Sequence, residues 1–312
     1  MKFIKELNEG NSVNGVYLCK QRNSAVTKNG KEYENLVFAD KTGIMDGKIW
    51  DVNSNGIEDC DKNSFVYVVG DVVVYNGNKQ LNVKRLRVAE EGEYDKKDYY
   101  KTTNKDIEVL KSDLKGFMDS VENPYLKEIL EKIVTESTIK AMSKHSAAKS
   151  VHHAFVGGLL EHTVAVTRIC EQFTKMYDAL NHDLLITAAI LHDIGKLKEL
   201  SPFPTNDYTD EGQLIGHIVI GAQIVANKSA EIEGFPTVLR DELMHCILAH
   251  HGELEFGSPK KPALIEAVAL NMADNADAKI QSMTEIYEGD DEEGWFGYSN
   301  IFGSRIKRTS EI

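Results

Sequence analysis

Hydrophobic residues in the first ninety positions form short runs that are separated by polar, turn-forming residues. The length and composition of these runs are typical of β-strands. The segments 28–31 and 76–78 contain Asn-Gly steps, which favour hairpin turns. A weakly helical stretch at 54–61 follows the third run. Five strands with a short helix between the third and the fourth predict an OB-fold, a small all-β Greek-key barrel. The expected strands cover 13–21, 33–39, 44–50, 65–75 and 80–88.

The hydrophobic pattern changes after this predicted barrel. Residues 90–101 are acidic, rich in lysine and poor in aliphatic side chains, which is typical of a linker. From residue 104 the apolar positions recur at helical spacing, as Ile107, Leu110 and Leu114 do. Pro124 is expected to open the next helix. We therefore expect an OB-fold domain over residues 1–90, followed by a linker and connecting helices over residues 91–149.

From about residue 150 the pattern is helical throughout, which predicts an all-α domain over 150–285 and a tail over 286–312. One strongly apolar helix ends in His192-Asp193, and Gly195 allows the chain to turn out of that helix. The predicted fold class is therefore multidomain, with an N-terminal barrel, a helical connector and a C-terminal all-α domain. The expected helices cover 157–177, 183–193, a stretch that begins at 216, 243–250 and 263–277.

Length and charge narrow the possible functions. The 312 residues are enough for two domains of about 100–200 residues each. The net charge of −13 is unevenly divided, because residues 1–90 carry 13 Lys+Arg against 12 Asp+Glu and the remainder carries 23 against 37. This charge disfavours a strong non-specific binder of duplex nucleic acid. It leaves room for a local binding groove on the nearly neutral first domain.

The sequence also bears on the compartment. It contains no run of about 18 apolar residues, which a membrane span needs, and its first residues lack the apolar stretch of a signal peptide. The four cysteines form no Cys-x-x-Cys pair, so we expect reduced thiols in a cytoplasmic protein without a membrane partner. They are Cys19, Cys60, Cys170 and Cys246.

OB barrels bind single strands by stacking bases on aromatic side chains inside a basic groove. Trp50, Arg22 and Lys84 are candidate strand-binding residues in the predicted barrel. Each aromatic side chain has an alternative role in the barrel core. Lys84, Arg85 and Arg87 alternate along one predicted strand, so they cannot all face one groove. The sequence therefore predicts a strand-binding domain without fixing its contact residues.

Histidine and aspartate residues recur near or within the predicted helices, in the order H…HD…H…HH…D. Imidazole nitrogens and carboxylate oxygens suit Zn²⁺, Mn²⁺, Fe²⁺ or Co²⁺. A pair of such ions about 3.5–4 Å apart is a common device for hydrolysing phosphate esters. A single histidine on an apolar helix is usually a hydrogen-bonded core residue, and we assign His145, His182 and His245 to that class. The ordered set instead predicts a metal-dependent phosphohydrolase. It comprises His162, His192, Asp193, His217, His250, His251 and Asp274.

The combination His162…His192-Asp193…Asp274 resembles the signature of the HD superfamily of metal-dependent phosphohydrolases. Longer blocks resemble the YhaM family of bacterial 3′–5′ exoribonucleases, which joins an OB domain to an HD domain. The resemblance implies a 3′–5′ exonuclease that acts on single-stranded RNA, releases nucleoside monophosphates and is supported by Mn²⁺. Single-stranded DNA stays open as a further substrate. The blocks are HHAFVGGLLEHT (152–163), LHDIGKLKELS (191–201), GHIVIGA (216–222), HHGELEFGSPKKP (250–262) and ADNADAK (273–279).

The same resemblance implies a binuclear site. One ion would be bound by His162, His192, Asp193 and Asp274. The second would be bound by His217, His250 and His251, with Asp193 as the bridge. Trinuclear relatives carry a glutamate four residues before the first histidine, where this chain has Gly158, so we do not expect a third ion of that kind.

Further residues are expected to act on the substrate. Asp193 and Lys196 are the candidate catalytic residues, since a lysine three positions after the aspartate can touch a phosphoryl oxygen. A solvated position just past a helix end is the alternative for Lys196. His153 is expected either to contact the scissile phosphate or to support the ligands. Ser258 and Lys260 are candidates for the substrate channel.

Two other functions remain open at this point. One is an HD-type phosphodiesterase of nucleotides or cyclic dinucleotides, which would not need a strand-binding barrel. The other is a single-strand DNA-binding, replication-associated factor, which would not need the full ligand set. The sequence also leaves a homo-oligomer open, because Trp295, Phe296 and Phe302 in the tail can cover either the protein's own core or an interface.

Overall fold

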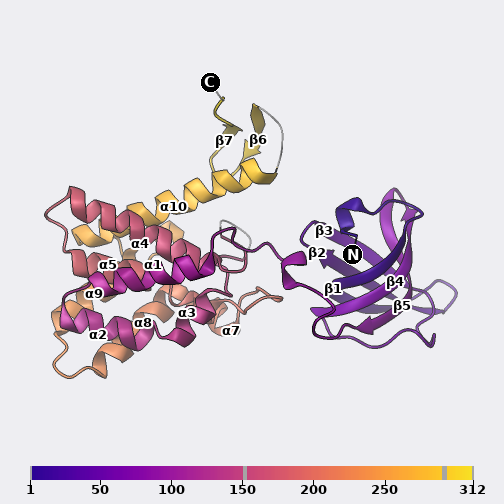
Figure 1. Cartoon of the computed structure of the whole chain (residues 1–312), viewed down its shortest axis with the longest axis horizontal. Coiled ribbons are helices and arrows are strands. Elements are labelled where there is room, and N and C mark those ends of the chain that lie inside the picture. The colour runs from indigo at the N-terminus through magenta and orange to yellow at the C-terminus, as the bar shows by residue number, and fades with distance from the viewer. Residues whose placement is uncertain (1, 150–152, 290–293, 311–312) are drawn as a thin grey trace. The chain divides into compact units, whose positions relative to one another are not determined.

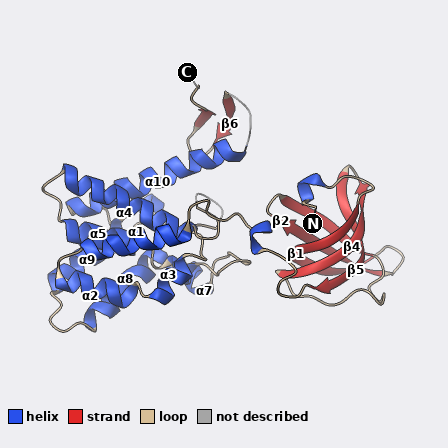
Figure 2. Ribbon diagram, viewed as in Figure 1, coloured by secondary structure: helices blue, strands red, loops and turns tan. Residues whose placement is uncertain are grey.

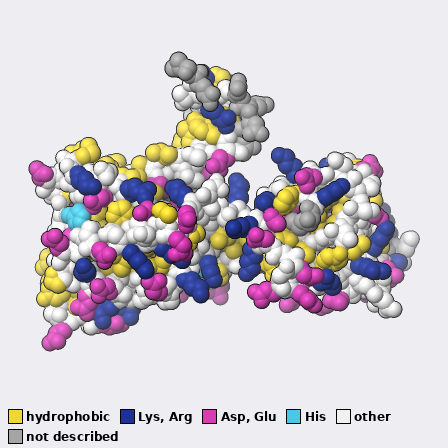
Figure 3. All heavy atoms as spheres, in the orientation of Figure 1, with side chains coloured by type: hydrophobic (Ala, Val, Ile, Leu, Met, Phe, Trp, Pro, Cys, Tyr) yellow, Lys and Arg dark blue, Asp and Glu magenta, His cyan; other side chains and the backbone are white. Residues whose placement is uncertain are grey.

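The protein is described by a computed structural model that covers residues 2–149, 153–289 and 294–310. The chain divides into two compact units, Met1–Thr102 and Thr103–Ile312. Figures 1 and 2 show that the first unit is built mainly from strands and the second mainly from helices. Acidic and basic side chains are intermingled over the face of each unit that Figure 3 shows. No helix in the described residues is long and apolar enough to cross a membrane.

The first unit is a closed five-stranded barrel, preceded by the short 3₁₀ helix η1 (Ile4–Glu6). The strand order around the barrel is β1-β2-β3-β5-β4, and every neighbouring pair is antiparallel except β3 and β5. The predicted OB-type barrel is therefore confirmed. The strands are β1 (Ser12–Val26), β2 (Glu32–Asp40), β3 (Gly43–Ile49), β4 (Ser64–Tyr75) and β5 (Asn78–Val88).

Alternation along the strands fills the barrel. Leu36 and Phe38 on β2 point inward, as do Val66 and Val68 on β4, and all four side chains are buried. A Cβ atom at Gly47 would lie 2.4 Å from the ring of Phe38, so the absence of a side chain on β3 makes room for that ring. The barrel core is thus continuous across its sheet.

The short helix predicted at 54–61 is wrong. These residues form turns, and Ile57 makes an isolated bridge to Leu86 on β5. The backbone N–H of Leu86 donates to the carbonyl of Gly56, and the N–H of Glu58 donates to the carbonyl of Leu86. Asn, Ser, Gly and Asp dominate this segment and favour turns over helix.

Residues expected to form a linker instead begin by packing on the barrel. The ring of Tyr94 stacks on Phe65 with centroids 4.0 Å apart, and the Tyr99 hydroxyl donates to the Val16 carbonyl at 2.9 Å. The short 3₁₀ helix η2 (Lys96–Asp98) lies between them. Aromatic side chains in an acidic, lysine-rich stretch gave the signal for this packing.

The second unit packs its helices around one apolar core. The most buried helix is α5, whose residues from Leu184 to Leu191 are buried on every side. Helices α1 and α2, which the sequence assigns to a connector, contribute Leu114 and Ile129 to the same core. Helical periodicity shows which face of a helix is apolar but not what covers it. The helices are α1 (Ile107–Ser120), α2 (Pro124–Ile133), α3 (Glu136–Met142), α4 (Gly158–Met176), α5 (His182–Leu191), α6 (Lys196–Glu199), α7 (Asp210–Ile215), α8 (His217–Ala230), α9 (Thr237–Ala249) and α10 (Ile265–Gly289), with the 3₁₀ turn η3 (Leu254–Phe256).

The tail has structure of its own. Helix α10 extends twelve residues past the predicted end at 277, to Gly289. Strand β6 (Trp295–Ser299) then pairs antiparallel with β7 (Ser304–Lys307). Phe296 is buried in this hairpin with its ring 5.4 Å from that of Tyr287 on α10, whereas Trp295 is exposed. The sequence contained no motif that predicted this hairpin.

Candidate metal centre

Five of the seven candidate ligands lie at the ends of helices. His192 and Asp193 follow directly after α5, and both side chains are buried. The chain then turns sharply through Gly195, where a Cβ atom would lie 2.0 Å from the carbonyl oxygen of His217. The absence of a side chain at Gly195 therefore allows the turn after α5 to approach the start of α8.

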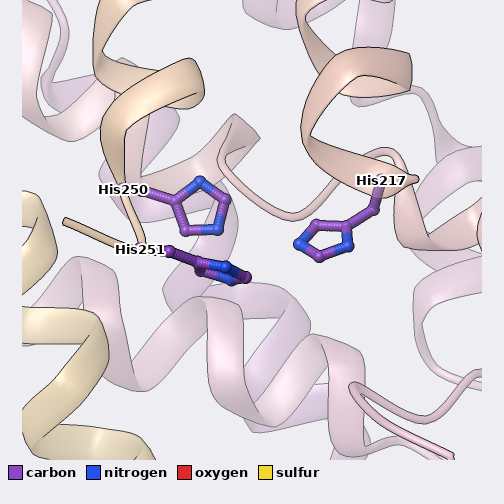
Figure 4. Close-up of side chains that lie close together, drawn as sticks. All are labelled: His217, His250 and His251. Atoms are coloured by element: carbon purple, nitrogen blue, oxygen red, sulfur yellow. The ribbon is translucent and has the colours of Figure 1, made fainter. Parts of the chain in front are cut away.

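The remaining candidates reach the same region from four helices. His162 lies in α4, His217 opens α8, and Asp274 lies in α10. His250 and His251 follow the last residue of α9. Figure 4 shows the rings of His217, His250 and His251 gathered together, with the first coming from a different helix than the other two.

One carboxylate oxygen of Asp193 faces two imidazoles. The Oδ2 atom lies 3.4 Å from Nε2 of His162 and 3.4 Å from Nε2 of His192. The two Nε2 atoms are 3.2 Å apart, and Oδ1 of Asp274 lies 3.2 Å from Nε2 of His162. The structure thus brings together the four side chains that the sequence assigns to one ion.

The other oxygen of Asp193 faces a second group of imidazoles. Its Oδ1 atom lies 3.5 Å from Nε2 of His217 and 3.8 Å from Nε2 of His250. His251 joins these two histidines in a cluster whose ligand atoms lie within 4.8 Å of one another. Asp193 therefore stands between the two groups with one oxygen directed to each.

All five imidazoles of the two groups place Nδ1 within hydrogen-bond distance of an oxygen. His192, His250 and His251 donate from Nδ1 to backbone carbonyls at 2.7–2.8 Å. His162 and His217 donate from Nδ1 to carboxylates at 2.7 and 2.8 Å. A neutral ring that donates from Nδ1 carries its lone pair on Nε2. In their neutral forms, four of these rings therefore direct the Nε2 lone pair toward Asp193, namely those of His162, His192, His217 and His250.

This donor set fits divalent cations. The Oδ1 atom of Asp193 and the Nε2 atoms of His217 and His250 are buried and make no hydrogen bond with the described part of the chain. Such atoms are costly to bury unless a cation or another partner satisfies them. Two atoms that each lie about 2.0–2.2 Å from one ion are about 3–3.5 Å apart, which matches the shorter separations in both groups. Nitrogen and oxygen ligands of this kind suit transition metals.

The electrostatics of the centre favour metal-binding protonation states for several ligands. Burial alone would raise the pKa of Asp193, but Lys196 and His192 hold it well below its usual range. Burial, assisted by neighbouring imidazoles, lowers the pKa of His250 and of His251. Burial would also lower the pKa of His162, but hydrogen bonds to Asp193 and two other carboxylates raise it well above the usual value. An anionic Asp193 and neutral His250 and His251 are the forms that bind metals.

The sequence missed two supporting carboxylates. Oδ2 of Asp277 accepts from Nδ1 of His162 at 2.7 Å and from Nε2 of His153 at 2.9 Å. Oε1 of Glu199 accepts from Nδ1 of His217 at 2.8 Å and from its backbone N–H at 2.9 Å. Asp277 follows Asp274 by one helical turn, which was the available signal. His153 thus contacts the same carboxylate that accepts from His162.

Lys196 also lies at the centre rather than in solvent. Its ammonium is 2.7 Å from Oδ2 of Asp193, and its side chain is 11% exposed. A cavity of about 680 Å³ adjoins this point and is lined by Lys196, His251 and Asp274 together with the loop after α9. The wall includes Phe256 and Lys261 rather than the predicted Ser258 and Lys260. Ser258 is buried and donates to the carbonyl of Leu248 at 3.1 Å.

The candidate strand-binding residues of the barrel have unequal environments. Arg22 pairs with Glu34 at 2.8 Å and is only 12% exposed, so the barrel itself engages its guanidinium. Lys84 forms an ion pair with Asp71 on β4. Trp50 is 45% exposed and stacks on Tyr33 with ring centroids 5.2 Å apart. The sequence missed Tyr33, because an isolated tyrosine in a strand gives no sign of its stacking partner.

Both units of the chain are similar to parts of known proteins. The family model described as "HD domain" matches residues 159–279, the part of the chain that contains every candidate ligand. The first unit is similar to the second OB-fold domain of replication protein A from Methanococcus maripaludis, with 19% identity, coverage of 29% of this chain and 96% of that chain, and a TM-score of 0.24. The barrel topology and the family match together define an HD-domain protein with an N-terminal OB-type barrel.

Relatives that align with most of the chain define its family more closely. The chain is 33% identical to the 3′-5′ exoribonuclease YhaM of Geobacillus sp. over 288 residues, which are 92% of this chain and 88% of that protein. It is also 33% identical to the 3′-5′ exoribonuclease YhaM of Bacillus pumilus, over 92% of this chain and 91% of that protein. The chain therefore belongs to the YhaM family.

Proposed function

We propose that this protein is a metal-dependent 3′–5′ exoribonuclease that hydrolyses single-stranded RNA to nucleoside monophosphates at a binuclear centre. The observation that carries the proposal is that the Nε2 atoms of four imidazoles lie 3.4–3.8 Å from the two carboxylate oxygens of Asp193. Its relatives named as 3′-5′ exoribonucleases span nearly the whole chain, barrel included. Single-stranded DNA is a further substrate under this proposal, and the cytoplasm is the proposed location.

The proposed cofactor is a pair of divalent cations, Mn²⁺ above all, with Co²⁺, Fe²⁺ and Zn²⁺ compatible with the same ligands. When bound, such a pair polarises phosphoryl oxygens and lowers the pKa of water. His162, His192 and Asp274 would hold one ion and His217, His250 and His251 the other. Asp193 supplies one oxygen to each set.

Other residues of the chain prepare this chemistry. Asp277 and Glu199 accept hydrogen bonds from Nδ1 of His162 and His217, which orients Nε2 of each ring toward Asp193. Lys196 lines the adjoining cavity with a buried ammonium. A positive charge at this place can stabilise the charge that develops on a phosphoryl oxygen during the reaction. Lys196 is thus the proposed catalytic cation of the chain.

The barrel is proposed to hold the strand while the helical unit cleaves it. Tyr33 and Trp50 form a partly exposed aromatic pair, and the Lys48 ammonium lies 4.7 Å from the Tyr33 ring centre. Aromatic platforms beside cations bind single strands with little dependence on sequence. Affinity without specificity is what a degradative exonuclease requires.

End-labelled oligonucleotides test the proposal. With Mn²⁺, RNA labelled at its 5′ end should shorten one nucleotide at a time, and RNA labelled at its 3′ end should release a labelled mononucleotide at once. His192→Ala and Asp193→Ala should abolish cleavage of the RNA but leave its binding by the barrel intact. His245→Gln is a matched control, because His245 lies on the same helix as the residues leading to His250 and its Nε2 atom accepts from the backbone N–H of Ala263.

Other outcomes would favour the alternatives. A gel shift without cleavage would support a single-strand-binding factor. Hydrolysis of cyclic dinucleotides with no action on RNA would support a small-molecule phosphodiesterase. Full activity in Asp193→Ala would refute the proposed centre.

A further inference from the structure

The cavity beside the metal centre has two walls of different origin. One wall is a single face of α10, which presents Val268, Asn271, Met272 and Asn275 at intervals of three or four residues. The other wall is the segment 251–262, which contains the short helix η3. Since Lys196, His251 and Asp274 also line it, the cavity opens directly onto the centre.

Phe256 stands on the second wall, and its ring is strongly exposed, at 67%. Its backbone carbonyl accepts the hydrogen bond from Nδ1 of His251 at 2.8 Å. The residue that carries this aromatic ring is therefore tied directly to a candidate metal ligand. The exposed ring of Phe256 lines the cavity beside the centre, where it can contact a bound ligand.

The shape of this segment is built into the sequence. Gly252 has a φ of +80°, and a Cβ atom there would lie 2.6 Å from the side chain of Asn271. The Asn271 amide donates to the carbonyl of His250 at 2.8 Å. Gly257 has a φ of +88° directly after Phe256. Two left-handed glycines and one amide thus hold the loop against α10.

The lining chemistry matches one nucleotide. Phe256, Met272 and Pro262 supply flat or apolar surface, and Lys196 supplies positive charge. Lys261 on the same wall is paired with Glu253 at 2.6 Å. The volume of about 680 Å³ is in the range of about 300–1,000 Å³ that small-molecule sites occupy. A base with an attached phosphate combines the same two properties, one flat and partly apolar, the other anionic.

We propose that Phe256 is the platform on which the base of the 3′-terminal nucleotide stacks, with that nucleotide in the cavity and its 5′-phosphate at the metal centre. This inference rests on the proposed exonuclease function. An exonuclease cuts the bond that joins the last nucleotide, so the terminal nucleoside and the scissile phosphate occupy adjoining sites. Stacking on one aromatic ring accepts every base. Phe256 would therefore bind the 3′ end of the strand without selecting its sequence.

A double-mutant cycle, in which a change in the protein is combined with a change in the RNA, tests whether the terminal base stacks on Phe256. The substrates are one single-stranded RNA with a normal 3′ end, the same RNA with an abasic terminal residue, and the same RNA with an abasic penultimate residue. In the wild type the abasic terminus should lower kcat/KM about 5- to 150-fold, the effect of one stacked base. Phe256→Ala should lower kcat/KM on normal RNA by a similar factor, and the abasic terminus should cause no further loss in that variant.

Two further variants separate stacking from folding. Phe256→Trp should restore activity on normal RNA, because the larger ring still stacks. Leu254→Ala, which removes another exposed side chain from the same short helix, should leave kcat/KM unchanged. Losses that multiply in Phe256→Ala with the abasic terminus would overturn the inference, as would a larger effect from the penultimate position. An absence of RNA cleavage by the wild type would overturn the proposed function, and the inference with it.

Discussion

Nε2 of His162 lies 3.2 Å from Nε2 of His192, although the Nδ1 atom of each ring already donates a hydrogen bond to an oxygen. Two neutral imidazoles in these tautomers would face each other lone pair to lone pair. A proton on one ring or a cation between the rings removes that repulsion. Because Asp193 and Asp274 converge on the same point, a divalent cation satisfies more of the donors than a proton does.

The carboxylate of Asp277 should control metal affinity without being a ligand. Asp277→Asn removes the negative charge that holds His162 and His153, so we expect Mn²⁺ to bind about 10–100-fold more weakly. Titration calorimetry and the Mn²⁺ dependence of RNA cleavage measure this change. Saturating Mn²⁺ should restore most of the rate. Asp178→Asn, an exposed aspartate of the same unit, is the control, and equal affinities in the two variants would contradict the supporting role.

Glu199 should play the corresponding part for the second group of ligands. Glu199→Gln weakens the hydrogen bond that orients His217, which is expected to lower the affinity of one ion about 10–100-fold and leave the other nearly unchanged. Calorimetry in the two variants should therefore show two different sites weakened. If Asp277→Asn and Glu199→Gln weaken the same site, the division of the ligands between two ions is wrong.

The sequence revealed the seven candidate ligands because their order and spacing are a property of the chain itself. It could not reveal Asp277 or Glu199, since an aspartate or a glutamate on a helix is ordinarily a solvated side chain. Their roles depend on which neighbouring helix delivers an imidazole to them. The same limit applies to Phe256 and Lys261, because the turn at Gly257 decides which residues of the loop face the cavity.

Periodicity predicted element types better than their surroundings. The five strands and the main helices formed where they were expected. The sequence predicts a helix at 54–61 rather than turns because the pairing of this segment with β5 is not visible in local sequence. The sequence assigns α1 and α2 to a connector, because the apolar face of a helix does not reveal which other element packs against it. The hairpin after α10 is held by Phe296 against Tyr287, a contact that no local pattern predicts.

Trp50 should matter for long strands more than for short ones. Trp50→Ala removes the exposed half of the Tyr33–Trp50 stack, so the dissociation constant for a long single-stranded RNA should rise about 5- to 150-fold. Fluorescence anisotropy in EDTA measures this binding without cleavage. The kcat on a trinucleotide should stay the same. Val88→Ala, which truncates an exposed apolar residue of β5, is the control, and equal losses on long and short substrates would refute the division of labour.

The pH dependence of Cys60 alkylation tests how neighbouring groups in the first unit shift the pKa of this thiol. A hydrogen bond with the Cys19 thiol lowers the pKa of Cys60, burial opposes this shift, and Arg22, with Nη1 3.4 Å from the sulfur, lowers it further. The thiolate fraction rises as pH passes upward through the pKa, so alkylation of Cys60 should reach its plateau at a lower pH than for a free cysteine. Arg22→Gln should shift the profile to higher pH.

Burial raises the pKa of the Cys246 thiol to about 12, and burial also raises the pKa of the Cys170 thiol. Both should resist iodoacetamide in the folded protein. Mass spectrometry of peptides after labelling at several pH values checks all three sites. A Cys60 profile that coincides with that of a free cysteine would contradict the proposed influence of Cys19 and Arg22.

The central claim is that Asp193 joins two divalent cations in one centre. Equilibrium dialysis against Mn²⁺, followed by elemental analysis of the protein, measures the number of bound ions directly. We expect two Mn²⁺ per chain in the wild type and in Asp178→Asn, and a loss of both in Asp193→Asn. One ion or none in the wild type, or full loading of Asp193→Asn, would contradict it.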